Sequence, residues 1–194
     1  MKIKTLLILL LIGIVTRASA QQKEWHHLLE LLQKEAAYFQ GKEGFIQPEN
    51  SDYNRFVIEE ASVNDSLIVF GMRLRDHTGK ETTEQYVCET LVLKPEPPVI
   101  KSAEIYYDFS FYFGDFPRAQ FLRIELDEED KLINKIENSY KDSKTGEEYR
   151  NEMEDKTDRI LLPVRAKNRA EILQAIDDYQ AETLKYDLEY KSRF

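Results

Sequence analysis

The stretch that decides the fold is IVFGMRLR, residues 68–75, in which large apolar side chains occupy every second position. The positions between them become polar towards the end of the stretch, at Arg73 and Arg75. Alternation with a period of two is typical of a β-strand with one buried and one solvated face. A turn at 77–80, which contains a glycine, separates this strand from a second apolar stretch at 85–93. The pattern predicts a β-hairpin.

Similar extended stretches recur along most of the chain and predict a largely antiparallel sheet of about six to eight strands. Besides the hairpin, strands are expected at 56–59, 104–113, 121–126, 131–140 and 160–164, with a charged strand or loop before 158. Segment 131–140 also fits a helical i, i+4, i+8 series, but the acidic turn before it is hairpin-like and favours a strand. Asn64-Asp65-Ser66 is expected to be a turn.

Two amphipathic helices are expected to flank the sheet, one near each end of the chain. Residues 25–39 place large apolar side chains at i, i+3, i+4 and i+7 spacing, and Gly41 follows as a stop signal. Residues 172–183 show a second apolar stripe, preceded by Asn168 and Glu171 at the spacing of a capping box. The fold class is therefore predicted to be α+β.

Residues 1–20 have the features of a secretory signal peptide. Two lysines precede an apolar run at 6–15, and residues 18–20 (ASA) supply the small side chains that a signal peptidase reads. The run is too short to span a bilayer. We therefore expect cleavage near Ala20 and release of residues 21–194, without membrane insertion, into the periplasm or the extracellular space.

The remaining residues are expected to form a single globular domain. A proline-rich segment, 94–98 (KPEPP), interrupts the strand pattern and reads as a stiff, extended connector. It divides the chain into two parts, neither of which has enough apolar residues for an ample core. We therefore expect it to carry the chain from one sheet edge to another within one domain.

The charge of the chain limits its partners. The formal net charge is −9, and removal of the three basic residues in the signal takes it to −12. This balance excludes nucleic acid as an expected partner, because phosphates would be repelled. It would speed association with a basic protein, although solubility alone also explains it.

The densest local pattern is a run of seven aromatic residues in the eleven positions 106–116. If 104–113 is one strand, its odd-numbered aromatic residues form a core face. The other face would carry Tyr106, Asp108, Ser110 and Tyr112, which could stack on a sugar or a peptide and hydrogen-bond to it. The alternative is a central strand whose second face is covered by a helix.

The acidic turn Asp127, Glu128, Glu129 and Asp130 opens a segment, 127–158, with twelve acidic and six basic residues. The turn lacks the ligand spacing and the glycine of a calcium loop. Such a segment is typical of a solvated sheet edge, and it is also the place where a basic partner is expected to bind.

No motif of a known catalytic site, metal site or cofactor site is present in the sequence. His26 and Glu30 lie four apart on a helix but supply only two ligands, and Cys88, the only cysteine, is expected to be packed in a strand. We therefore expect no cofactor. An exported, soluble, acidic domain that acts through a protein interface is favoured over an enzyme. An inhibitor or immunity-type protein for a basic partner is one version. The alternative is a binding protein or hydrolase for a small ligand, a sugar or a peptide, using the aromatic strand face.

Overall fold

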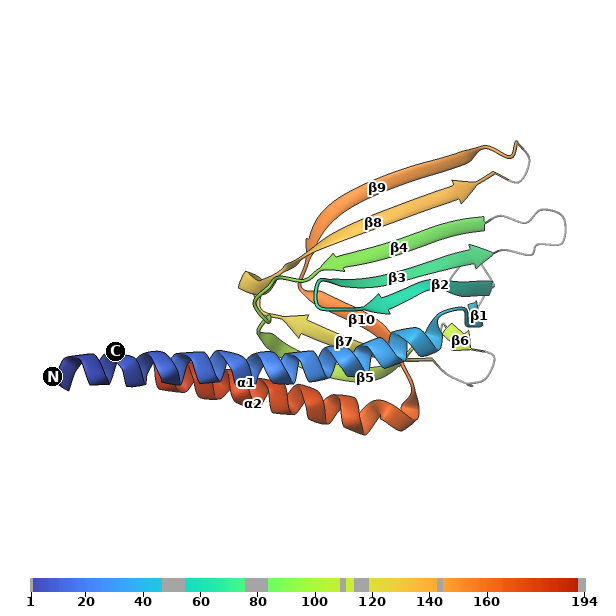
Figure 1. Cartoon of the computed structure of the whole chain (residues 1–194). Coiled ribbons are helices and arrows are strands. Elements are labelled where there is room, and N and C mark those ends of the chain that lie inside the picture. Colours follow the sequence, from blue (N-terminus) through green and yellow to red (C-terminus); the bar gives the residue numbers. More distant parts are fainter. Residues whose placement is uncertain are drawn as a thin grey trace.

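The computed structural model of the chain confirms the α+β class (Figure 1): its described residues form two α-helices, a seven-stranded sheet and a three-stranded sheet. The structure describes residues 2–46, 55–75, 84–108, 111–113, 119–142 and 145–191. The two sheets are joined by a core to which both helices contribute.

The large sheet is built from the alternating segments around the stretch at 68–75. Its strand order is β6-β1-β2-β3-β4-β8-β9, and all neighbours are antiparallel. The strands are β1 (Glu43–Ile46), β2 (Arg55–Val63), β3 (Leu67–Arg75), β4 (Glu84–Val92), β6 (Phe111–Phe113), β8 (Leu132–Lys141) and β9 (Glu148–Thr157). The pairing of β3 with β4 confirms the predicted hairpin, although its turn lies outside the described residues.

The small sheet has the order β10-β7-β5 and is also antiparallel. It consists of β5 (Ile100–Asp108), β7 (Ala119–Leu126) and β10 (Arg159–Val164). The proline-rich connector leads from β4, an inner strand of the large sheet, to β5 at the edge of the small one, and not from one sheet edge to another as expected.

Two details of the predicted sheet are wrong. Segment 104–113 is not one strand, because β5 pairs with β7 in the small sheet whereas β6 pairs with β1 in the large one. The acidic turn does not close a hairpin either, since β7 and β8 belong to different sheets. Period-two alternation identifies an extended segment, but it does not say which strand will pair with it.

Helices α1 (Lys2–Phe39) and α2 (Arg169–Lys191) pack antiparallel, so that both ends of the chain lie at the same end of the molecule (Figure 1). Trp25 contacts Tyr179 with ring centroids 5.4 Å apart, and the Gln21 amide donates a hydrogen bond of 3.2 Å to Thr183. The segment predicted as a signal is continuous with the amphipathic part of α1. Within the described part of the chain, neither helix is long and apolar enough to cross a membrane.

The apolar stripes of both helices lie in one core with residues of both sheets. All the apolar residues that define the predicted stripe of α1 are buried, as are the main apolar residues of α2. These are Trp25, Leu28, Leu29, Leu32, Ala36 and Phe39 in α1, and Ile172, Ile176 and Tyr179 in α2. Burial of each large side chain contributes about 1.5–3 kcal/mol, so this core holds the sheets in fixed positions relative to the helices.

A buried ion pair ties α1 to the chain segment before α2. Glu35 is only 1% exposed and accepts hydrogen bonds from the backbone N–H and the guanidinium of Arg165, both at 2.7 Å. The amide of Asn168 also donates to Glu35, and the Arg165 guanidinium lies over the Tyr38 ring, 4.3 Å from its centroid. Asn168, expected from sequence only as a helix cap, therefore also links the two helices.

Candidate functional site

The four residues of the predicted aromatic face do not share a single strand. Tyr106 lies on β5 of the small sheet, between the Phe121 ring, 6.1 Å away, and the Arg123 guanidinium, 5.4 Å away. Tyr112 lies on β6 of the large sheet. Ser110 and the side chain of Asp108 lie outside the described residues. Tyr107, expected in the core, is 44% exposed. A ligand site at these residues stays a prediction, but its premise of one continuous strand face is wrong.

Two residues of the acidic turn, Asp127 and Asp130, make hydrogen bonds within the fold. Asp127 caps a short 3-10 helix, Glu128–Asp130, by accepting a hydrogen bond from the backbone N–H of Glu129 at 3.2 Å. Asp130 accepts a hydrogen bond of 2.7 Å from the backbone N–H of Val99 and lies 3.5 Å from the ammonium of Lys94. These contacts fasten the proline-rich connector. Glu128 and Glu129 are exposed, and their role towards a partner stays a prediction.

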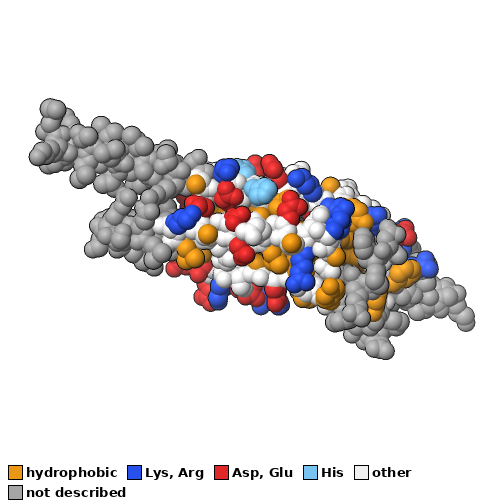
Figure 2. All heavy atoms as spheres, turned by 90° about the horizontal axis from the view of Figure 1, so that it is seen from below, with side chains coloured by type: hydrophobic (Ala, Val, Ile, Leu, Met, Phe, Trp, Pro, Cys, Tyr) orange, Lys and Arg blue, Asp and Glu red, His pale blue; other side chains and the backbone are white. Residues whose placement is uncertain are grey.

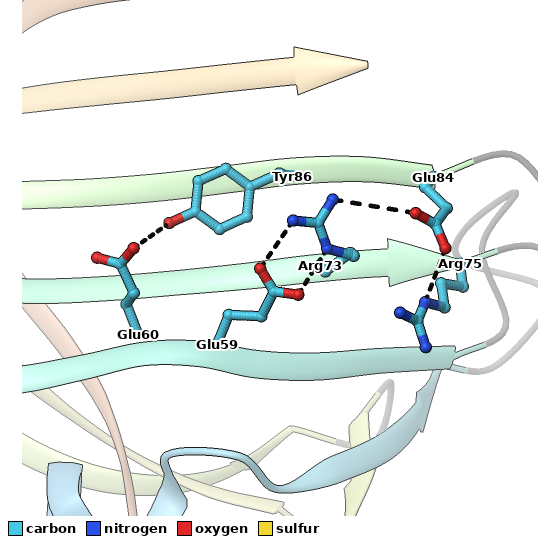
Figure 3. A network of polar contacts seen from close by, with 6 residues as sticks. All are labelled: Glu59, Glu60, Arg73, Arg75, Glu84 and Tyr86. Atoms are coloured by element: carbon cyan, nitrogen blue, oxygen red, sulfur yellow. Dashed lines mark hydrogen bonds and ion pairs between the residues drawn. The ribbon is translucent and has the colours of Figure 1, made fainter. Parts of the chain in front are cut away.

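One face of the large sheet points towards the core, and the opposite, outer face carries most of its charges. On the outer face of β2, β3 and β4, Arg73 makes two hydrogen bonds to Glu59, of 2.6 and 2.9 Å (Figure 3). Arg75 lies 3.0 Å from Glu84 in the same network. The Glu59 carboxylate raises the pKa of Arg73. These charge-assisted hydrogen bonds and ion pairs join the outer faces of β2, β3 and β4.

Cys88 lies on this outer face, beside Tyr86, whose hydroxyl donates a hydrogen bond of 3.1 Å to Glu60. Gly71 makes room for them, since a Cβ there would lie 2.8 Å from the Tyr86 hydroxyl and 3.3 Å from the Cys88 sulfur. Burial raises the pKa of the Cys88 thiol and that of the Tyr86 hydroxyl. A thiol with a raised pKa is a poor nucleophile. Cys88 is also buried, which confirms the packed cysteine expected from the sequence.

The core-side face of the large sheet extends beyond the core on strands β3, β4, β8 and β9, and we call this part the open face. Directly paired residues share a face of a sheet, so the register defines its members. They are Phe70, Met72, Leu74, Gln85, Val87, Glu89, Asn134, Ile136, Asn138, Tyr140, Tyr149, Asn151, Met153 and Asp155. Towards β9 this face is uncovered, because Tyr149 is 57% exposed and Met153 is 53% exposed.

The open face differs sharply from the outer face of the same strands. On β8 and β9, the outer face carries acidic and basic side chains in nearly equal numbers, for example Glu137 and Arg150, which form an ion pair of 2.8 Å. The open face carries apolar and amide side chains and only two charges, Glu89 and Asp155, which are both acidic. Exposed apolar side chains rimmed by polar ones are typical of a binding surface.

The open face is not predicted by the sequence, because the summed charge of segment 127–158 indicates one acidic surface. The signal that identifies it is the period of two in β9, where Tyr149, Asn151 and Met153 alternate with charged residues. The open face could have been found by separating the two faces of each strand before counting charges.

The helical side of the molecule has a mixed surface where its side chains are described. Figure 2 shows acidic, basic and apolar side chains interspersed over the two helices. His26 Nδ1 lies 2.8 Å from a carboxylate oxygen of Asp65 in the turn between β2 and β3. Within the described ranges, no three histidine, cysteine or acidic side chains are grouped so that they could hold a metal ion.

Comparison of the chain with models of protein families, with curated proteins and with solved structures gave no match.

Proposed function

We propose that this protein is an exported, non-enzymatic binding domain that holds a basic protein partner on the open face. One observation carries the proposal: the open face combines exposed apolar side chains, Tyr149 and Met153, with charged side chains that are all acidic. Apolar contact would supply most of the affinity, whereas the acids would select a basic surface and speed its approach. An inhibitor or immunity-type role towards a basic toxin or enzyme is the specific version that this charge pattern favours.

Export is part of the proposal. The lysine-led apolar segment before residues 18–20 supports cleavage after Ala20. The described contacts between α1 and α2 begin at Gln21, so cleavage there would leave them in place. The released domain would meet its partner in the periplasm or outside the cell.

A capture experiment with two matched variants tests the binding face. Met153→Lys and Glu154→Gln each raise the net charge of β9 by one, the first by adding a positive charge and the second by removing a negative one, at neighbouring positions on opposite faces of the sheet. We expect the immobilised mature protein to retain a partner from an extract of the native compartment. The Met153→Lys variant should retain about tenfold less of this partner than the wild-type protein. Glu154→Gln should retain the wild-type amount.

The salt dependence of the same capture tests the charge of the partner. A basic partner should be retained less at high salt, because screening weakens exposed ion pairs. Equal losses with both variants, or an acidic protein as the retained partner, would contradict the proposed function.

A further inference from the structure

Three hydrogen-bond acceptors lie together on the open face, on three neighbouring strands. Asn134 on β8 is directly paired with Asp155 on β9, so their side chains are neighbours about 5 Å apart at Cβ. Glu89 on β4 is paired with Ile136, two residues from Asn134 along the same face. This diagonal position is about 7–8 Å from Asn134, so the three acceptors lie in one patch of the open face that spans β4, β8 and β9.

Among the residues that the structure describes, no lysine or arginine lies beside these acceptors on the open face. The side-chain oxygen of Asn134 is buried and without a hydrogen-bond partner, in a residue that is only 8% exposed. The Asp155 carboxylate accepts one hydrogen bond, from the backbone N–H of Lys156 at 2.7 Å, and the open face holds no lysine or arginine. A buried acceptor without a donor destabilises the folded state, and a donor brought by a partner would remove this cost.

We propose that Glu89, Asn134 and Asp155 form the subsite for one lysine or arginine side chain of the protein partner. Ile136 and Met153 lie beside the three acceptors on the same face, where they can contact the aliphatic stem of that side chain. A divalent cation takes six or more oxygen ligands. The apolar side chains of Ile136 and Met153 supply none, so this subsite differs from a divalent-cation site. The inference rests on the proposed function and specifies the chemistry of its partner.

The environment of Glu89 gives the subsite a pH dependence. Burial raises the pKa of the Glu89 carboxyl above its ordinary value, because its apolar neighbours, Phe70 and Ile136, disfavour the charged form. A bound cation favours the ionised form. Affinity for a cation is therefore expected to be present above the raised pKa of Glu89 and to weaken as the pH falls through it. The carboxyl of Asp155 is the other titratable group on this face.

Peptide probes that differ only in one charge test the subsite. Acetyl-Leu-Lys-Leu-amide and its norleucine counterpart would be titrated into the ¹⁵N-labelled mature protein, with chemical-shift changes recorded at each backbone amide. We expect the lysine peptide to shift the amides around Asn134 and Asp155 and to bind about tenfold more tightly than the norleucine peptide. The double variant Glu89→Gln/Asp155→Asn should abolish this preference and its pH dependence, whereas Glu152→Gln/Glu154→Gln, on the outer face, should preserve both.

The outcomes separate the subsite from the proposed function. Equal binding of the two peptides to the open face would overturn the subsite and leave the binding face standing. If hexylammonium alone bound as tightly as the lysine peptide, or if Ca²⁺ shifted the same amides, the site would be one for a small cation rather than a protein side chain. If neither peptide shifted open-face amides at roughly 5 mM, both proposals would be contradicted.

Discussion

Replacement of Arg165 by leucine is expected to lower the free energy of unfolding by about 3–5 kcal/mol. The substitution leaves the Glu35 carboxylate, 1% exposed, without the guanidinium that donates to it at 2.7 Å. Only the backbone N–H of residue 165 and the Asn168 amide would remain as donors. Unfolding in urea, followed by circular dichroism, measures the loss.

Two further variants make this prediction specific to burial. Arg159→Leu is the matched control, because Arg159 is largely exposed and its guanidinium forms a long ion pair of 3.8 Å with Asp158. This substitution should change the free energy of unfolding by less than about 1 kcal/mol. The double variant Glu35→Met/Arg165→Met should recover much of the loss, since it removes both charges from the interior. A cost for Arg165→Leu no larger than that for Arg159→Leu would show that the pair does not tie the helices together.

Replacement of Gly44 by alanine is expected to lower the free energy of unfolding by about 3 kcal/mol, the upper end of the range for overpacking. Gly44 lies on β1, where an added Cβ would be 2.5 Å from the backbone oxygen of Tyr112 and closer still to the Phe56 ring. The oxygen belongs to the neighbouring strand β6, and the Phe56 ring is buried, so neither can move freely.

Glu43→Ala, at the adjacent exposed position of β1, is the control for Gly44→Ala. Thermal unfolding of the two variants should differ by several degrees, because 1 kcal/mol corresponds to about 2–4 °C in a chain of this size. Equal melting temperatures would mean that β1 and β6 do not pack as closely as the structure indicates.

The sequence predicted those parts of the fold that depend on local patterns. The period-two alternation at 68–75 identified β3 and its hairpin with β4, and the apolar spacing from Trp25 to Phe39 identified the buried face of α1. The division into two sheets was not predicted, because it depends on pairing between distant segments. The alternation predicts one strand from Glu104 to Phe113, yet this part of the chain contributes residues to one strand in each sheet.

The candidate site depended even more on tertiary structure. Glu89, Asn134 and Asp155 are separated by up to 66 positions in the sequence and meet only because β8 lies between β4 and β9. Counting charges along 127–158 indicated an acidic surface. The structure instead assigns Asp127 and Asp130 to a capping contact and a connector, and it places uncharged residues on the open face.

The central claim is that the partner lies on the open face, and site-specific photo-cross-linking tests it most directly. A benzophenone-bearing amino acid would be placed at Met153, at Glu154 on the opposite face of the same strand, or at Leu184, which is exposed on α2. After illumination of intact cells, we predict one discrete protein adduct from position 153 and none from positions 154 and 184. An adduct from 154 or 184 without one from 153 would contradict the account.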